Sequence, residues 1–186
     1  MNLIFRIIRV WITSFFKARI DDHLAPSYLK FRVLPNDLDT NFHMNNGRYL
    51  TIMDLGRFDL ILRNGLLKVM LQDKAIPVLS ASQIRYRIPL HLWEAYDLET
   101  QIMCWDDKWF YIQQRFIIRS GEKAGVTAAV ALLKGAFYSR KTKDTVPSSH
   151  LLRAVGADLN SPRFPDYIAQ WVDAENALRD HTRKAL

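Results

Sequence analysis

Residues 39–49 read Asp39-Thr40-Asn41-Phe42-His43-Met44-Asn45-Asn46-Gly47-Arg48-Tyr49 and join a predicted strand to a predicted long helix. Before this stretch, residues 28–34 alternate as in a strand, and the turn-forming residues 35–37 end that pattern. After it, apolar residues recur at helical spacing over residues 49–62, and Asn64-Gly65 is a stop signal. Asp39 is therefore predicted to lie in a strand-to-helix connection.

A carboxylate that faces the start of a helix can be a reaction centre. The acid supplies or activates a nucleophile, while unpaired N–H groups and the helix dipole polarise a carbonyl oxygen. Asp and Asn are also the preferred residues in turns and helix caps. For Asn45 and Asn46 a capping role and a direct role both stay open, whereas for Asp39 we favour catalysis over a purely structural role.

Several blocks of this sequence resemble one known family. They are Val33-Leu34-Pro35-Asn36-Asp37-Leu38-Asp39, His43-Met44-Asn45-Asn46-Gly47-Arg48-Tyr49-Leu50, Asp54-Leu55-Gly56-Arg57, Trp105-Asp106-Asp107-Lys108-Trp109-Phe110-Tyr111 and Arg115-Phe116. Together they are similar to the hotdog-fold acyl-CoA thioesterases of the 4-hydroxybenzoyl-CoA thioesterase-like group. Within that group the chain looks most like the subgroup that includes the thioesterase superfamily member six proteins. The similarity covers most of residues 28–140.

The resemblance implies a set of site residues. Asp39 stands ten residues before Tyr49, as the family's catalytic carboxylate does, and would act as general base or as nucleophile. The backbone N–H of Asn46 would hold the thioester carbonyl, with His43 and Asn45 lining the same centre. Asp37, the earlier acid, is not expected to act directly. His43, Asn45 and Asn46 replace an aromatic or aliphatic run of those enzymes, so we expect a more polar pocket.

The implied substrate is an acyl-CoA, and coenzyme A enters only as part of it, with no separate cofactor. Arg85, Arg87 and Lys134 could meet its phosphates through charge-assisted hydrogen bonds, as could Arg140, Lys141 and Lys143. No pair among the five histidines has metal-ligand spacing, so we expect no metal site. Members of the family pair with each active site at the subunit interface, which implies a homodimer or a dimer of dimers.

Two other functions stay open. Hydration of an enoyl-CoA is one, because hotdog hydratases pair an Asp with a His in a short loop; they resemble Asp-x-Asn-Pro-x-His, and the Pro is missing between Asp39 and His43. A non-catalytic acyl-CoA or lipid-binding protein, with the N-terminal segment as its membrane address, is the other.

The predicted order of one strand, a long helix and four more strands indicates an α+β fold. The expected architecture is an antiparallel sheet wrapped around the central helix, with strands within residues 77–88, 98–104, 110–118 and 124–137. We divide the chain into an N-terminal amphipathic helix (1–22), a hotdog domain (23–146) and a helical extension (147–186). A final helix is predicted from about Asp166, with a docking face of Ile168, Trp171, Val172, Ala174 and Leu178.

The charge of the chain is unevenly placed. Of the net charge of +7, residues 1–20 carry +4 without an acid, while the other 166 residues hold 22 basic and 19 acidic side chains. The body is nearly balanced and carries no nucleic-acid-binding motif, so we do not expect nucleic acid as a partner. The lone cysteine, Cys104, excludes an internal disulfide and favours a reducing compartment, hence a cytoplasmic protein. Cys104 is expected to be buried and not to be a nucleophile.

The N-terminal segment, Leu3 to Ile20, is apolar but is interrupted by Arg6 and Arg9, which argues against a membrane-spanning helix or a signal peptide. At 100° per residue it forms an amphipathic helix. A polar stripe of Asn2, Arg6, Arg9, Thr13 and Lys17 opposes Ile4, Phe5, Ile8, Trp11, Ile12 and Phe15. Residues 1–20 are expected either to lie on an anionic membrane surface or to dock on the body with the polar stripe in water.

Overall fold

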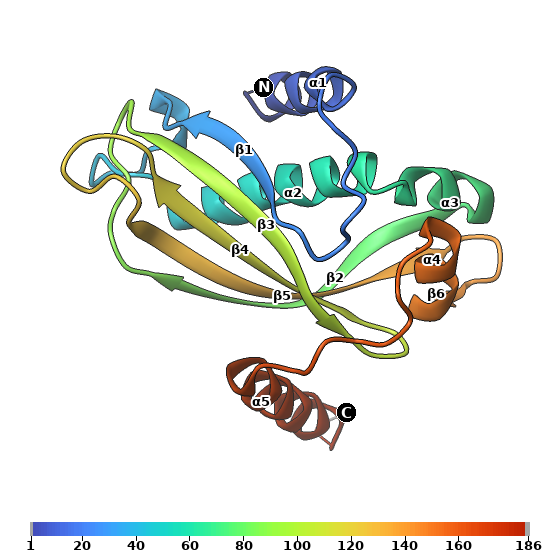
Figure 1. The fold of residues 1–186 in the computed structure, drawn as a ribbon. Helices are drawn as coiled ribbons and strands as arrows, with labels where there is room; N and C mark the ends of the chain where they lie inside the picture. The colour runs from blue at the N-terminus through green and yellow to red at the C-terminus, as the bar shows by residue number, and fades with distance from the viewer. Residues whose placement is uncertain (1, 185–186) are drawn as a thin grey trace.

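The computed structural model describes residues 2–184 and contains one six-stranded antiparallel sheet that curls around a long helix, α2 (Asn46–Arg63) (Figure 1). The order across the sheet is β1-β3-β4-β5-β2, and β6 pairs with β5. The strands are β1 (Ser27–Arg32), β2 (Ala75–Tyr86), β3 (Ala95–Trp105), β4 (Phe110–Ile118), β5 (Thr127–Ser139) and β6 (Asp144–Val146). The predicted α+β fold is confirmed.

The main core lies between α2 and the concave face of the sheet. Tyr49, Ile52 and Met53 of α2 are buried there against Leu98 and Phe116. Gly56 makes this close packing possible. A Cβ at Gly56 would stand 2.6 Å from Gln114 Nε2 and 2.9 Å from Leu98 Cδ2, and closer still to Thr100 Oγ1. The glycine therefore sets the distance between the central helix and the sheet, and with it the position of the helix N-terminus.

The predicted strands are confirmed with small shifts at their ends, but two short helices were not predicted. They are α3 (Leu66–Asp73) and α4 (Ser148–Val155), each of eight residues, after which α5 (Asp166–Lys184) begins at the expected residue. The N-terminal helix α1 (Asn2–Ser14) is also shorter than the predicted 3–20. Thr13 Oγ1 donates to Arg9 O at 2.8 Å and Ser14 Oγ donates to Trp11 O at 2.7 Å, so side-chain hydroxyls bind carbonyls in the last turn.

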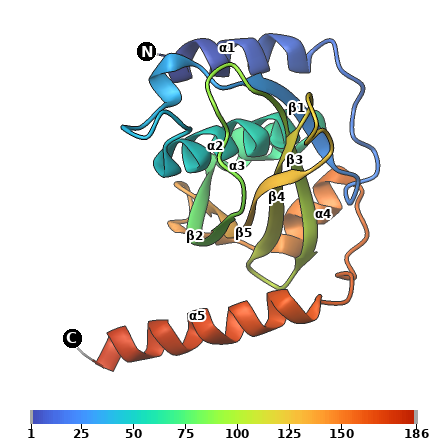
Figure 2. The same cartoon turned by 90° about the vertical axis from the view of Figure 1, so that its left-hand side faces the viewer.

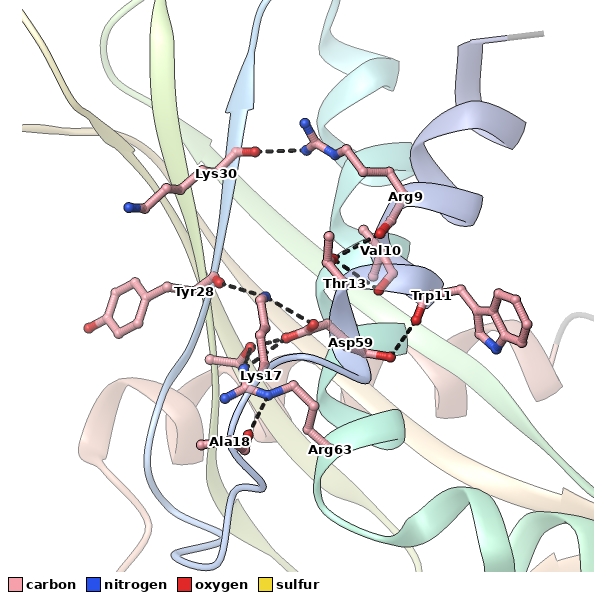
Figure 3. A network of polar contacts seen from close by, with 12 residues as sticks. Arg9, Val10, Trp11, Thr13, Lys17, Ala18, Tyr28, Lys30, Asp59 and Arg63 are labelled. Atoms are coloured by element: carbon pink, nitrogen blue, oxygen red, sulfur yellow. Dashed lines mark hydrogen bonds and ion pairs between the residues drawn. The ribbon is translucent and has the colours of Figure 1, made fainter.

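Helix α1 docks on the body with its polar stripe inward, which is the reverse of the expectation that this stripe would lie in water. Two cations of the helix and Lys17 after it donate to every second carbonyl of the edge strand β1. Arg6 Nη2 reaches Arg32 O at 3.3 Å. Arg9 Nη2 reaches Lys30 O at 2.8 Å, and Lys17 Nζ, just beyond the helix, reaches Tyr28 O at 3.3 Å (Figure 3). Lys17 Nζ also lies 3.1 Å from Asp59 Oδ1 of α2. The side chain of Asn2 lies outside the described part of the structure.

Helix α5 lies on the face of the sheet opposite to α2 (Figure 2). Its Ile168 is fully buried beside Cys104 and Tyr111, and Trp171 and Val172 pack against the same cluster. Ala174 and Leu178 are exposed, so their predicted place in the docking face is wrong; Glu175, which pairs with Lys134, takes part in its stead. Among residues 2–184 no helix is both long enough and apolar enough to cross a membrane.

Candidate active site

The loop that carries Asp39 is closed on itself. Leu38 and Met44 form an isolated bridge, Asp39 N donates to His43 O at 2.9 Å, and Phe42 N donates to Asp39 O at 3.1 Å. At its tip, Phe42 adopts a left-handed conformation (φ 60°) and is 78% exposed. A bulky residue in this conformation is uncommon and is held only by its surroundings. The closed turn thus fixes the backbone position of Asp39, from which its side chain projects.

The carboxylate of Asp39 is partly buried, with a side chain 22% exposed. Its Oδ1 accepts a hydrogen bond from Asn41 N at 2.8 Å, and His43 Nδ1 lies 3.5 Å from the same oxygen. The His43 ring stands edge-on to His91, with the ring centroids 6.3 Å apart. The structure therefore brings Asp39 and His43 together, as the sequence predicts.

The start of α2 has one structural residue and one unpaired donor group. Asn45 is the N-cap: its side-chain oxygen accepts from Gly47 N at 2.8 Å and its carbonyl accepts from Arg48 N at 2.9 Å. Asn46 is the first helical residue, so its N–H has no acceptor within the helix. Its carbonyl accepts from Tyr86 Oη at 3.1 Å, which ties the helix start to β2. Asn45 therefore caps α2, and Asn46 offers a backbone N–H that has no acceptor within the helix.

Asp37 is fully buried and holds the loop in place. Its carboxylate accepts from Arg6 Nη2 at 2.5 Å, from Leu34 N at 3.0 Å, and from Arg48 at 3.1 Å (Nε) and 3.0 Å (Nη2). Its carbonyl accepts from Asn45 N at 2.8 Å. All of these bonds are structural, in keeping with the expectation that Asp37 does not act directly.

A cavity of about 420 Å³ lies farther along α2. Its walls are mostly apolar and come from α1, α2, the turn after α2, α3 and the strands β2 to β5: Leu3, Ile7, Asp54, Leu55, Arg57, Phe58, Leu60, Ile61, Asn64, Leu66, Pro77, Val78, Leu79, Ile102, Phe110, Ile112, Gly135, Ala136 and Phe137. The predicted site residues Asp39, His43, Asn45 and Asn46 do not line it. At a rise of 1.5 Å per residue, Asp54 lies about 12 Å along the helix from Asn46. The loop that carries Asp39 and the cavity thus lie at two different levels along α2.

The cavity wall carries a polar group to which the sequence analysis assigned no role. Arg57 pairs with Asp54, and its Nη1 donates to Gln114 Oε1 at 3.0 Å. Burial lowers the pKa of Arg57, although Asp54 acts in the opposite direction. Gln114 Nε2 in turn donates to Thr100 Oγ1 at 2.7 Å and to Met53 O at 3.0 Å. The signal in the sequence was an oppositely charged pair three residues apart within an apolar helix.

Of the six cations predicted to meet coenzyme A phosphates, Lys134, Arg85 and Arg87 differ in their surroundings. Lys134 is buried, and its Nζ lies 2.5 Å from Glu175 Oε2 and 5.2 Å from the centroid of the Trp109 ring. Its assignment to phosphate binding is therefore wrong, because its charge is already paired under α5. Arg85 and Arg87 are exposed at and just beyond the end of β2 and stay predictions.

Cys104 is fully buried, and burial together with Asp106 raises the pKa of its thiol to about 12. A thiol with so high a pKa is a poor nucleophile at neutral pH. Within residues 2–184 no group of three or more His, Cys, Asp or Glu side chains could hold a metal ion.

Comparison with known proteins gives a consistent result. Residues 33–172 match the thioesterase-like superfamily. Over 189 residues the chain is 34% identical to the protein THEM6 of Xenopus laevis, with 97% of this chain and 87% of the frog protein covered. Among solved structures, the probable thioesterase YbaW of Escherichia coli has a TM-score of 0.62 at 22% identity, covering 69% of this chain and 95% of that one. The DHNA-CoA thioesterase of Staphylococcus aureus has a TM-score of 0.59 at 14% identity, covering 87% and 95%. The structural likenesses confirm the hotdog fold.

Proposed function

The chain belongs to the thioesterase-like superfamily, and we propose that within it this protein hydrolyses an acyl-CoA thioester to a free acid and coenzyme A. The observation that carries the proposal is that one short segment of the matched region holds a partly buried carboxylate and then leads into a helix whose first N–H has no acceptor within the helix. Asp39 supplies the carboxylate and Asn46 supplies the first free N–H of α2. General-base or nucleophilic chemistry and oxyanion stabilisation need these two groups.

The reaction follows from the roles of these groups. Asp39 takes a proton from water as the water oxygen attacks the thioester carbon, and the N–H of Asn46 donates to the oxygen on which negative charge develops. Collapse of the tetrahedral intermediate breaks the carbon–sulfur bond, and the departing thiolate takes up the proton. In the nucleophilic alternative, Asp39 attacks the carbon, the carbon–sulfur bond breaks and the coenzyme A thiolate leaves, which gives a mixed anhydride; water then hydrolyses the anhydride to the free acid and regenerates the Asp39 carboxylate. His43 orients Asp39 in both routes.

A homodimer is part of the proposal. Strand β2 is twelve residues long, pairs with β5 on one side, and forms one edge of the sheet. Pro77, Val78 and Leu79 of β2 line the cavity, and Tyr86 of the same strand binds the start of α2. A second copy paired along β2 would therefore close the cavity and stand beside the catalytic loop. Sedimentation equilibrium should give a dimer that Leu79→Lys, at 43% exposure, converts to a monomer; a wild-type monomer contradicts this part.

The test of catalysis uses two aspartates with the same local role. Asp22 Oδ1 accepts from Leu24 N at 2.9 Å, as Asp39 Oδ1 accepts from Asn41 N at 2.8 Å, but Asp22 lies in the loop between α1 and β1 and not in the loop that leads into α2. With release of free thiol measured over acyl-CoAs of several chain lengths, Asp39→Asn should lose about 10²–10⁴-fold in turnover. Asp22→Asn should keep wild-type turnover, because only its turn is affected. A folded Asp39→Asn variant with wild-type turnover would show that the role given to Asp39 is wrong.

The distance of 3.5 Å between His43 Nδ1 and Asp39 Oδ1 also favours a second candidate, hydration of an enoyl-CoA. Hydration removes the conjugated double bond and its absorbance without releasing thiol, so crotonyl-CoA separates the two reactions. A third outcome, tight binding of acyl-CoA without either change, would identify a binding protein.

Peripheral attachment to a membrane through residues 1–20 completes the proposal. It is supported by the outward face of α1 and the residues that follow it, where Phe5 is 70% and Trp11 is 48% exposed. Because Arg6, Arg9 and Lys17 bind β1, we expect apolar burial to dominate over attraction to anionic lipid. Co-sedimentation with phospholipid vesicles should retain wild type and Leu71→Ser, a control at 72% exposure on α3, and lose Phe5→Ser/Trp11→Ser. Equal retention of all three would exclude attachment through α1.

A further inference from the structure

The side chains of helix α1 point to three sides with different surroundings. Its polar side binds β1 and Asp37, as described above. Its outward side is apolar and exposed: Ile4, Phe5, Ile8, Trp11 and Ile12, continued by Phe15 and Phe16. Between these two sides, Leu3 and Ile7 line the cavity, and Ile7 is at the same time 37% exposed. Ile7 therefore belongs both to the surface and to the cavity wall.

The apolar surface is continuous from the outside of α1 into the cavity. Residues three or four apart on a helix are neighbours, so Ile7 stands next to Leu3 on the cavity side and next to Trp11 on the outward side. Across the cavity, Phe58 of α2 and Leu79 of β2 continue the apolar wall. An apolar chain could pass from the surface of α1 to the interior and stay among apolar side chains along the way.

The outward face of α1 fits hydrocarbon better than a soluble protein. Protein interfaces carry a polar rim around their apolar centre. Between Leu3 and Phe16 the two charged residues, Arg6 and Arg9, are bound to the body, so they do not give the outward face such a rim. Trp and Phe beside branched aliphatic residues are typical of helices that lie in the interfacial layer of a bilayer. The occupant of this face is therefore a phospholipid surface.

We infer that α1 forms the membrane-side wall of an entrance through which the acyl chain of a bilayer-borne, long-chain acyl-CoA reaches the cavity. This inference rests on the proposed thioesterase and names its substrate class. An acyl group whose carbonyl lies at the N–H of Asn46 must extend about 12 Å along α2 before it reaches the level of Asp54. A short acyl group cannot span this length, whereas a long chain fills the apolar cavity beyond it.

The experiment compares two substrates with the full-length protein. Thiol release is measured with palmitoyl-CoA in phosphatidylcholine vesicles and with butyryl-CoA in solution. The ratio of the two rates should fall at least tenfold in Phe5→Ser/Trp11→Ser, since neither residue lines the cavity but both contact lipid. The ratio should stay unchanged in the surface control Leu71→Ser. An unchanged ratio in the double variant overturns the inference, and so does a wild type that prefers butyryl-CoA.

A second readout does not depend on turnover. Uptake of a fluorescent long-chain fatty acid from vesicles should be slowed at least tenfold by Phe5→Ser/Trp11→Ser and by Ile7→Asp, which places a charge in the entrance. If no acyl-CoA is hydrolysed but uptake depends on these residues, the proposed function fails and the entrance stands. If hydrolysis occurs and uptake does not depend on these residues, only the proposed entrance is refuted and the proposed function stands. Self-association through α1, seen as a smaller oligomer of the double variant without vesicle binding by wild type, also overturns it.

Discussion

Replacing Gly56 with alanine tests whether close contact between α2 and the sheet sets the architecture of this protein. The added Cβ would stand 2.6 Å from Gln114 Nε2 and nearer still to Thr100 Oγ1. Normal contacts of this kind are longer by several tenths of an ångström or more. Either the helix moves away from the sheet, or Gln114 and Thr100 turn aside and lose the hydrogen bonds that they make at 2.7 Å to each other and at 3.0 Å to Met53 O.

The magnitude follows from three terms. Overpacking of a core costs about 1–3 kcal/mol, and two disturbed buried hydrogen bonds cost about 1 kcal/mol each. Alanine in a helix is favoured over glycine by about 1 kcal/mol, which acts in the opposite direction. We therefore expect Gly56→Ala to lower the free energy of unfolding by about 3 kcal/mol, which for a chain of this size lowers Tm by about 6–12 °C.

The matched control is Gly47→Ala, in the first turn of the same helix, where the added Cβ meets only the capping oxygen Asn45 Oδ1, at 3.2 Å. It should change stability by less than about 1 kcal/mol, because the gain in helix propensity offsets a slight shift of that cap. Urea unfolding followed by circular dichroism gives both free energies, and the thiol-release assay shows whether the start of α2 has moved. Equal stability of the two variants would refute the packing role given to Gly56.

Three further predictions concern buried groups. Asp37→Asn should lower the free energy of unfolding in urea by about 3–5 kcal/mol, because two arginines lose their buried partner. Asp180→Asn, at an exposed ion pair, should change it by less than about 0.5 kcal/mol. A small effect of Asp37→Asn would contradict the structural role given to its buried ion pairs. Cys104 should resist a thiol reagent at pH 8 in the folded protein and react at once in denaturant, because burial raises its pKa to about 12; fast native reaction would show that the site opens. Burial alone would raise the pKa of Glu99, but hydrogen bonds from Arg115 and Tyr28 prevail and lower it below 4.5. Its stabilising effect is therefore present above the unfolded-state pKa and is lost as the pH falls through the lowered pKa. As the pH falls below 4.5, wild type should therefore lose more stability than Glu99→Gln, and parallel pH curves would disprove the effect.

The sequence was sufficient to predict the strands and the central helix, because their signals are local. Phe110, Ile112, Phe116 and Ile118 alternate on one face, and the structure buries this face against α2 or the neighbouring core. The eight-residue helices α3 and α4 were missed, since eight residues give barely two turns of periodicity and their existence depends on packing between them. The resemblance in the loop and the helix predicted the superfamily, which the comparison confirmed.

The orientation of α1 on the body could not be predicted in the same way. The periodicity of residues 3–17 separates two faces but does not tell which face meets the body. The choice is made by acceptors that belong to another part of the chain, namely Asp37 and the outward carbonyls of β1. The same limit applied to Lys134, whose partner Glu175 is 41 residues away in sequence. The relation of Asp39 to the cavity likewise depends on tertiary packing, which no local pattern contains.

The two edge strands of the sheet differ, because side chains cover β1 but not β2, and this asymmetry limits how many copies of the proposed dimer can assemble. A bare strand border is a template on which further chains can add without end, as in fibrils. Here the guanidinium and ammonium groups of residues 6, 9 and 17 block growth at β1, while β2 stays available. In the proposed homodimer, a second copy then adds once along β2, around a two-fold axis, and no further copy can add. Proteolytic loss of the first 20 residues should therefore convert a finite assembly into one that polymerises.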